Sequence, residues 1–153
     1  MADVKPIPEG YHSVTPYLVI KGAADAIDYY KKAFGAIELF RMDHEGKIGH
    51  AEIKIGNSHI MLADENAEMG FVGPQTVGGT PVSLMLYVDD VDKTYPQAIA
   101  AGGQELKPLQ DQFYGDRSGT LKDPFGHVWT VGTHKEDVTP EEMDKRLAAA
   151  HGA

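Results

Sequence analysis

Apolar and polar positions along the chain follow strand spacing and helix spacing in turn, and the same order occurs twice. Residues 14–20 combine β-branched and aromatic side chains, which is typical of a strand. Residues 23–34 carry apolar side chains at helical spacing, and Gly35 provides a helix end. Three more strands are expected to follow, over 36–43, 49–56 and 58–64.

A glycine-rich connector separates this first set of elements from a second one. The second set is expected to contain a strand over 81–88, a helix with an apolar stripe from Val91 to Ile99, and strands over 103–112, 117–122 and 127–133. Gly103 matches Gly35 at an offset of about 68 residues, which indicates an internal repeat. Pro96 interrupts the helical stripe and predicts either an irregular first turn or a later helix start.

The length of 153 residues fits one domain. Thr139 and Pro140, followed by two glutamates, are signals for the start of a terminal helix. The expected organisation is a flexible lead-in over 1–12, a single domain over 13–138 made of modules 13–65 and 81–135 with a connector over 66–80, and a C-terminal helix and tail over 139–153.

Composition narrows the classes of partner. The formal net charge of −9 argues against nucleic acid and anionic membranes. The absence of cysteine excludes disulfides, thiolate metal sites and a cysteine nucleophile. No apolar run approaches the roughly 18–20 residues of a membrane helix, and the first ten residues do not resemble a signal peptide. We therefore expect a cytoplasmic protein that binds neither nucleic acid nor membrane.

One stretch of sequence carries a family resemblance. Asp123-Pro124-Phe125-Gly126-His127-Val128-Trp129, followed by Thr133-His134, is the most specific part, and Thr15-Pro16-Tyr17-Leu18 and Gly115-Asp116-Arg117 add to it. Over residues 13–134 the chain resembles the vicinal oxygen chelate superfamily of glyoxalase I, bleomycin-resistance proteins and extradiol dioxygenases, and within it the PhnB-like group. The resemblance implies an α+β fold of two βαβββ modules whose curled mixed sheets surround a cavity. It also implies a homodimer, often with modules completed across chains.

Enzymes of this superfamily usually hold a divalent metal on four strand positions. Counted from the helix and turn signals, those positions are Thr15, Met61, Ser83 and Thr130 in this chain. None is His, Asp or Glu, and hydroxyl and thioether groups are poor ligands for Zn²⁺, Ni²⁺ or Fe²⁺. We therefore expect no metal cofactor, and no catalytic residue is assigned.

A different metal site remains an alternative. Strand alternation places His50, Glu52 and Lys54 on one face, opposite the apolar face that meets the helices. His50 and Glu52 should then face the cavity and could supply two ligands. The other interpretation is a polar strand face that meets water or makes hydrogen bonds.

The same alternation predicts a wall for a small organic ligand. Tyr17, Met85 and Tyr87 share the cavity-facing set with Thr15 and Ser83, and either line a pocket or pack inside a collapsed cavity. Tyr114 and Arg117 lie in an aromatic loop. Arg117 either holds an anionic or carbonyl group of the ligand or pairs with Asp116 or Asp123.

The predicted function is binding of a small organic molecule without metal. The ligand-binding set is Thr15, Tyr17, His50, Glu52, Met61, Ser83, Met85, Tyr87, Tyr114, Arg117 and Thr130. The alternative is a metal-dependent lyase, isomerase or dioxygenase of the same fold with non-standard ligands. A third possibility is a scaffold whose acidic surface and C-terminal helix serve a protein partner.

Overall fold

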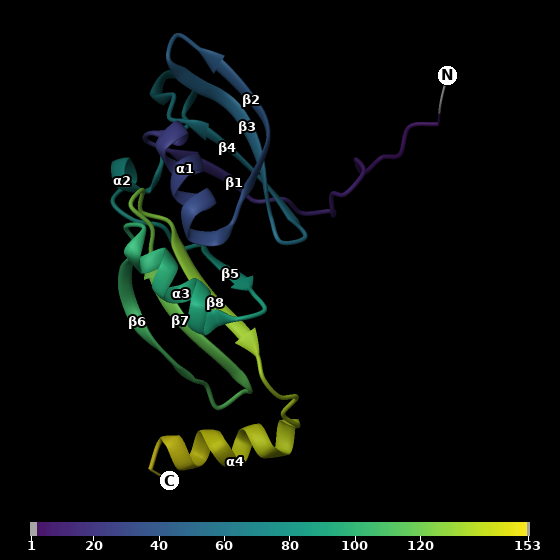
Figure 1. Cartoon of the computed structure of the whole chain (residues 1–153), viewed down its shortest axis with the longest axis vertical. Helices are drawn as coiled ribbons and strands as arrows, with labels where there is room; N and C mark the ends of the chain where they lie inside the picture. Colours follow the sequence, from purple (N-terminus) through teal and green to yellow (C-terminus); the bar gives the residue numbers. More distant parts are fainter. Residues whose placement is uncertain (1–2, 153) are drawn as a thin grey trace.

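The computed structural model describes residues 3–152, so residues 1 and 2 of the predicted lead-in and residue 153 of the predicted tail lie outside the described residues. The described chain forms two βαβββ modules, each with a four-stranded mixed sheet, and a C-terminal helix (Figure 1). The predicted fold class is therefore confirmed.

The first module has the sheet order β1-β4-β3-β2, with β1 parallel to β4 and the other pairs antiparallel. Its elements are β1 (Tyr17–Ile20), α1 (Ala23–Phe34), β2 (Ile37–His44), β3 (Lys47–Ile55) and β4 (Ser58–Asp64). The predicted strand over 14–20 starts later, at Tyr17. Proline lacks an N–H for the ladder, and Pro16 takes part only through its carbonyl, which accepts from Met61 N at 3.0 Å.

The second module repeats this topology as β5-β8-β7-β6, with β5 parallel to β8. Its elements are β5 (Ser83–Tyr87), α3 (Val91–Ala100), β6 (Gln104–Asp111), β7 (Asp116–Lys122) and β8 (Val128–His134). Helix α3 begins at Val91, whose N–H donates to Thr133 Oγ1 at 2.9 Å. Pro96 lies inside this helix, so the helix does not start late.

The connector and the chain end form short additional elements. A 3₁₀ turn, η1 (Ala67–Met69), and α2 (Pro74–Val77) lie between the modules, and α4 (Pro140–Ala150) follows the second sheet. Thr139 caps α4 as predicted, because its Oγ1 accepts from Glu142 N at 3.2 Å. No residue of α4 is buried, and the helix lies across the end of the second module (Figure 1).

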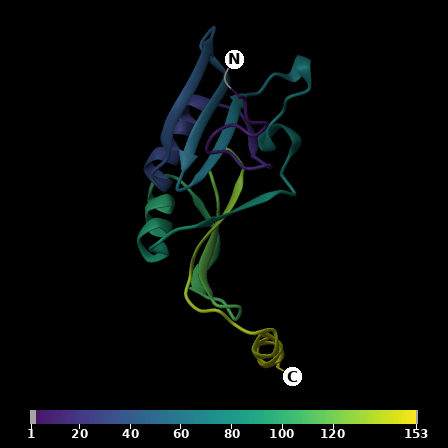
Figure 2. The same ribbon diagram turned by 90° about the vertical axis from the view of Figure 1, so that its right-hand side faces the viewer.

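Helices α1 and α3 contact each other and cover the same side of the two sheets (Figure 2). Helix α1 starts without a side-chain cap from its own N-terminus. Asp64 at the end of β4 supplies one instead, since its Oδ1 accepts from Gly22 N at 3.0 Å and Ala23 N at 2.9 Å. The side of both sheets that faces away from α1 and α3 is called the open face below.

The interface between the modules is centred on Trp129, which is buried. Its ring packs against α1 of the first module, with ring centroids 5.4 Å from Tyr30 and 4.8 Å from Phe34. Its indole N–H donates to the buried carboxylate of Asp123 at 2.9 Å. Trp129 therefore connects α1 of the first module to the Asp123 turn of the second.

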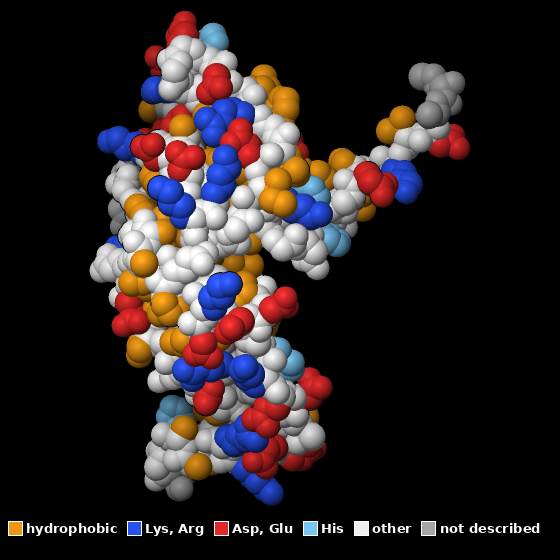
Figure 3. All heavy atoms as spheres, in the orientation of Figure 1, with side chains coloured by type: hydrophobic (Ala, Val, Ile, Leu, Met, Phe, Trp, Pro, Cys, Tyr) orange, Lys and Arg blue, Asp and Glu red, His pale blue; other side chains and the backbone are white. Residues whose placement is uncertain are grey.

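None of the helices among residues 3–152 is long and apolar enough to cross a membrane. The space-filling view shows acidic and basic side chains mixed over the side that carries α1 and α3, with hydrophobic side chains gathered at the waist between the modules and toward the N-terminal segment (Figure 3).

Candidate functional site

One row of side chains crosses the open face of the first sheet. The strand register pairs Tyr17 with Met61, Met61 with Glu52, and Glu52 with Phe40, so the four side chains lie side by side on four adjacent strands. Tyr17 and Phe40 are 46% and 47% exposed, a large fraction for aromatic side chains on a sheet. The row is therefore an apolar, aromatic surface interrupted by a single carboxylate.

The corresponding row of the second sheet joins Met85, Thr130, Thr120 and Lys107. The Thr120 and Thr130 hydroxyls share a hydrogen bond of 2.8 Å. Ser83 and Tyr87 lie two residues before and after Met85 and share its exposed face, and Tyr87 is 58% exposed. The structure thus places the predicted residues of β5 and β8 on one open face, while their role in binding stays a prediction.

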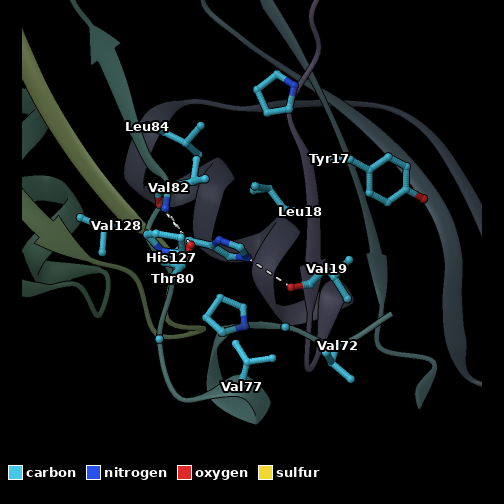
Figure 4. A pocket seen from close by; sticks show the side chains of 15 residues that line it. Tyr17, Leu18, Val19, Val72, Val77, Thr80, Val82, Leu84, His127 and Val128 are labelled. Atoms are coloured by element: carbon cyan, nitrogen blue, oxygen red, sulfur yellow. Dashed lines mark hydrogen bonds between the residues drawn. The ribbon is translucent and has the colours of Figure 1, made fainter. Parts of the chain in front are cut away.

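Two hollows join the modules. Thr15 and Met85, predicted from different modules, both line a hollow of about 140 Å³ together with His12 and His59. A larger hollow of about 320 Å³ lies between β1, the connector and β5, where His127 Nε2 lies 3.2 Å from the carbonyl oxygen of Val19 (Figure 4). The ring of Tyr17 points away from this larger hollow (Figure 4).

The four positions that would hold a divalent metal do not provide suitable donors. Met61 and Thr130 lie on β4 and β8, Ser83 begins β5, and Thr15 precedes β1. Their donors are one thioether and three hydroxyls, and the Thr130 hydroxyl is engaged by Thr120. Among residues 3–152, moreover, no three His, Cys, Asp or Glu side chains are grouped to hold a metal ion. The donor set does not fit the metal of the family's enzymes.

His50 and Glu52 face the open side of β3, as the alternation predicts. Their polar atoms are already partnered: His50 Nδ1 lies 2.9 Å from the Tyr17 hydroxyl, His50 Nε2 lies 3.1 Å from Glu52 Oε2, and the Tyr11 hydroxyl donates to Glu52 Oε1. Desolvation raises the pKa of Tyr17, which keeps its hydroxyl protonated. The four side chains form a continuous chain of hydrogen bonds, called the first cluster below.

A second cluster occupies the end of the second open face. The Tyr87 hydroxyl donates to Asp116 Oδ2 at 2.7 Å, and His134 Nδ1 lies 2.7 Å from Asp116 Oδ1. His134 Nε2 lies 2.7 Å from Asp137. Sequence reasoning missed Asp116 and Asp137, because residue 116 was treated as a loop position. Extending the alternation of β7 back by one residue would have found Asp116.

The structure does not bring Arg117 to these open faces. Its guanidinium bonds Asp92 of α3 at 3.0 Å and Asp111 at 3.2 Å, in place of the expected Asp116 or Asp123. These hydrogen bonds raise the pKa of Arg117. Tyr114 lies in the loop between β6 and β7, edge-on to Phe113 at 5.2 Å. Arg117 therefore ties β7 to α3.

The second cluster predicts a pH effect on stability. Hydrogen bonds to Asp116 and then Asp137 raise the pKa of His134 above its ordinary value of 6.5. A raised pKa in the folded state stabilises the fold below the ordinary value, and this contribution is lost as pH rises through the folded pKa. We expect His134→Gln to lower the unfolding midpoint at acidic pH and much less at alkaline pH. His44→Gln, at the exposed end of β2, is the control, and an equal loss for His134→Gln at every pH would contradict the prediction.

The comparisons with known proteins agree with this topology. A family model for the Glyoxalase/Bleomycin resistance protein/Dioxygenase superfamily matches residues 11–131. The chain belongs to this superfamily. An uncharacterized protein of Mycobacterium bovis is 39% identical to this superfamily member over 141 residues, which cover 90% of this chain and 93% of that protein.

Two solved structures extend the likeness. TioX from Micromonospora sp. ML1 aligns with a TM-score of 0.64 and 26% identity over 84% of this chain and 100% of its own. A PhnB protein from Bacillus cereus, described as a putative 3-demethylubiquinone-9 3-methyltransferase, aligns with a TM-score of 0.61 and 20% identity over 80% and 99% of the two chains. At that identity, the second likeness shows the superfamily fold alone.

Proposed function

We propose that this superfamily member binds a small organic molecule on the open faces of its sheets without a metal at the four usual positions. The observation that carries the proposal is the half-exposed apolar surface of Tyr17, Phe40 and Met85 beside four positions that lack metal ligands. Small-molecule sites are mostly apolar with a few placed polar groups, and the two clusters provide such groups. We further propose that the chain is a member of the PhnB-like group.

A second copy of the chain is proposed to complete the site. In one protomer the open faces leave Tyr17, Phe40, Met42, Met85 and Tyr87 about half exposed, which is costly for contiguous apolar surface. The N-terminal segment extends away from the modules, and α4 has no buried residue (Figure 1). A homodimer would cover these faces and turn two open walls into a cavity.

The dimer proposal predicts the mass of the particle in solution. We expect analytical ultracentrifugation to give twice the chain mass of 16.6 kDa at micromolar concentration. A charged side chain on the apolar part of one open face should shift this equilibrium, so Met42→Lys on the edge strand β2 is expected to increase the monomer fraction. A matched change on an exposed residue outside the face, Val77→Lys in α2, should leave the dimer intact. A wild-type protein that sediments as a monomer would contradict the proposal.

The ligand proposal is tested by stability in the presence of compounds. A bound ligand stabilises the fold by RT ln(1 + [L]/Kd), which is about 2.7 kcal/mol at a hundredfold excess over Kd. We expect aromatic and aliphatic small molecules to raise the melting temperature with and without chelator. A screen in which only metal-loaded protein responds to compounds would favour the metal-dependent alternative instead.

Metal analysis separates the two functions directly. Because the four positions offer hydroxyl and thioether groups, we expect far less than one metal per chain after incubation with Zn²⁺, Ni²⁺, Mn²⁺ or Fe²⁺ and desalting. About one tightly held metal per chain would contradict the proposal. In that case, loss of the metal in His50→Ala would assign the site to His50 and Glu52.

A further inference from the structure

The hydroxyl protons of the tyrosines on the open faces already make hydrogen bonds within the protein. Tyr87 donates to Asp116 and Tyr11 donates to Glu52, and an ionised carboxylate can only accept. For Tyr17 the direction follows from its neighbour: His50 Nε2 faces the Glu52 carboxylate and so carries the ring proton. In the neutral ring, His50 Nδ1 then accepts the Tyr17 hydroxyl proton at 2.9 Å.

Each of these three oxygens therefore offers only lone pairs to a ligand. The arrangement is held in place, because both oxygens of Glu52, both nitrogens of His50 and both oxygens of Asp116 have partners within the protein. The Asp116 side chain is only 5% exposed. If Tyr87 or His134 turned away to water, a buried carboxylate oxygen would lose its donor, which is costly. A carboxylate oxygen of a ligand, which has no proton to donate, would meet another acceptor at Tyr17 or Tyr87.

We propose that the ligand is an apolar molecule that carries hydrogen-bond donors, as a hydroxyl, amide or amine group, and that carboxylates are excluded. The inference rests on the proposed binding function and adds the chemical class of the ligand. A donor on the ligand meets the lone pairs of Tyr17 or Tyr87, and its apolar body covers Met61, which is paired in register with Tyr17, or Met85, two residues before Tyr87.

The charges of the open faces favour the same class. Glu52, Asp116 and Asp137 belong to the two clusters, and the whole chain carries a formal net charge of −9. Of the basic side chains, His134 is held between two carboxylates, and Lys47 lines a hollow that contains Tyr17 together with Asp64 and Glu65. Lys54 is paired in register with His59, two residues along β3 from Glu52, and Lys107 lies on the edge strand β6. The remaining donors beside the rows include the uncharged hydroxyls of Thr15, Ser83 and the Thr120–Thr130 pair, and His12 and His59 line the hollow that also holds Thr15 and Met85.

The inference is tested with four compounds that share one ring system and one substitution position: naphthalenemethanol, naphthalenemethylamine, naphthoate and methylnaphthalene. Affinities are measured by fluorescence titration of the full chain at neutral pH. We expect the alcohol and the amine to bind at least about tenfold more tightly than naphthoate, since a buried carboxylate without donors is strongly disfavoured. Methylnaphthalene, which has no polar group, serves as the control for the apolar surface.

Two single substitutions locate the effect. Tyr17→Phe and Tyr87→Phe remove one acceptor each, from different modules, and each is expected to weaken alcohol binding by roughly two- to tenfold at the tyrosine that the ligand contacts. The affinity of each variant for methylnaphthalene is the reference, so the expected loss is a lower ratio of alcohol affinity to methylnaphthalene affinity. If one variant fails to fold, the other variant and the order of the four compounds on the unchanged protein still decide the question.

The outcomes separate this inference from the function on which it rests. Naphthoate binding as tightly as the alcohol, or alcohol affinity unchanged in both variants, would overturn the donor-bearing ligand while binding itself stands. No binding of any of the four compounds, methylnaphthalene included, would overturn the aromatic binding surface and the inference together.

Discussion

Replacing Asp123 by asparagine is expected to destabilise the protein by about 3–5 kcal/mol, the cost typical of breaking a buried, fully partnered charge. The Asp123 side chain is buried, with an exposure of 3%. Its Oδ2 accepts from the Tyr30 hydroxyl at 2.6 Å and from Trp129 Nε1 at 2.9 Å. Its Oδ1 accepts from the backbone N–H groups of Phe125 and His127 at 2.9 and 3.0 Å.

Asparagine can keep only one of these two acceptor oxygens. Its amide nitrogen would face either the two side-chain donors or the two backbone donors, so two buried donors lose their partner. Chemical denaturation with a two-state fit is the measurement. Asp28→Asn, an exposed carboxylate on α1, is the matched control and should change stability by less than about 0.5 kcal/mol. An Asp123→Asn protein as stable as that control would show that the carboxylate does not join the modules.

The same buried carboxylate changes the acid behaviour of its neighbour. Burial, and then the negative charge of Asp123, raise the pKa of Tyr30 well above its ordinary value of 10.0. Tyr30 therefore stays protonated and donates throughout the range in which the protein is folded. This contact spans 93 positions of sequence, from α1 to the turn before β8.

Local patterns predicted the fold but not these contacts. The bounds of α1 and β4 match the predicted ranges 23–34 and 58–64, because helix spacing, Gly35 and the Gly56-Asn57 turn are all local signals. Alternation also placed His50 and Glu52 on the open face. Asp123, by contrast, was recognised only as part of the family resemblance and as a possible partner of Arg117, since its partners Tyr30 and Trp129 are defined by how the two modules pack.

The candidate site shows the same division. The open-face positions of Tyr17, Met61, Met85 and Thr130 follow from period-two alternation. Alternation did not predict the position of Arg117, because a shift of one residue at the start of β7 moves a side chain to the other face. The pairing of His134 with Asp116 and Asp137 depends on how the segment after β8 returns past the β6–β7 loop, which no local pattern records.

Gly115→Ala is expected to lower the free energy of unfolding by about 2–4 kcal/mol. It should also change the hydrogen bonding of the second cluster. Gly115 has a φ of 104°, a region that side chains rarely adopt, and a Cβ added there would lie 2.2 Å from the backbone oxygen of Glu136. The Gly115 carbonyl accepts from Lys135 N at 2.9 Å and Glu136 N at 3.1 Å. These bonds hold the segment that carries Asp137 beside His134.

Gly46→Ala isolates the part of this effect that comes from the contact. Gly46 also has a positive φ, 78°, but an added Cβ meets nothing within 4 Å, so only backbone strain of about 1–2 kcal/mol is expected. The larger loss in Gly115→Ala then measures the displaced chain segment. Because that segment carries one of the two carboxylates that raise the His134 pKa, NMR titration of Gly115→Ala should show this pKa lower than in the wild type. Gly46→Ala should leave it unchanged. An unaltered His134 titration in a destabilised Gly115→Ala protein would mean that Asp116 alone sets the pKa, and that the chain segment after β8 does not take part in the cluster.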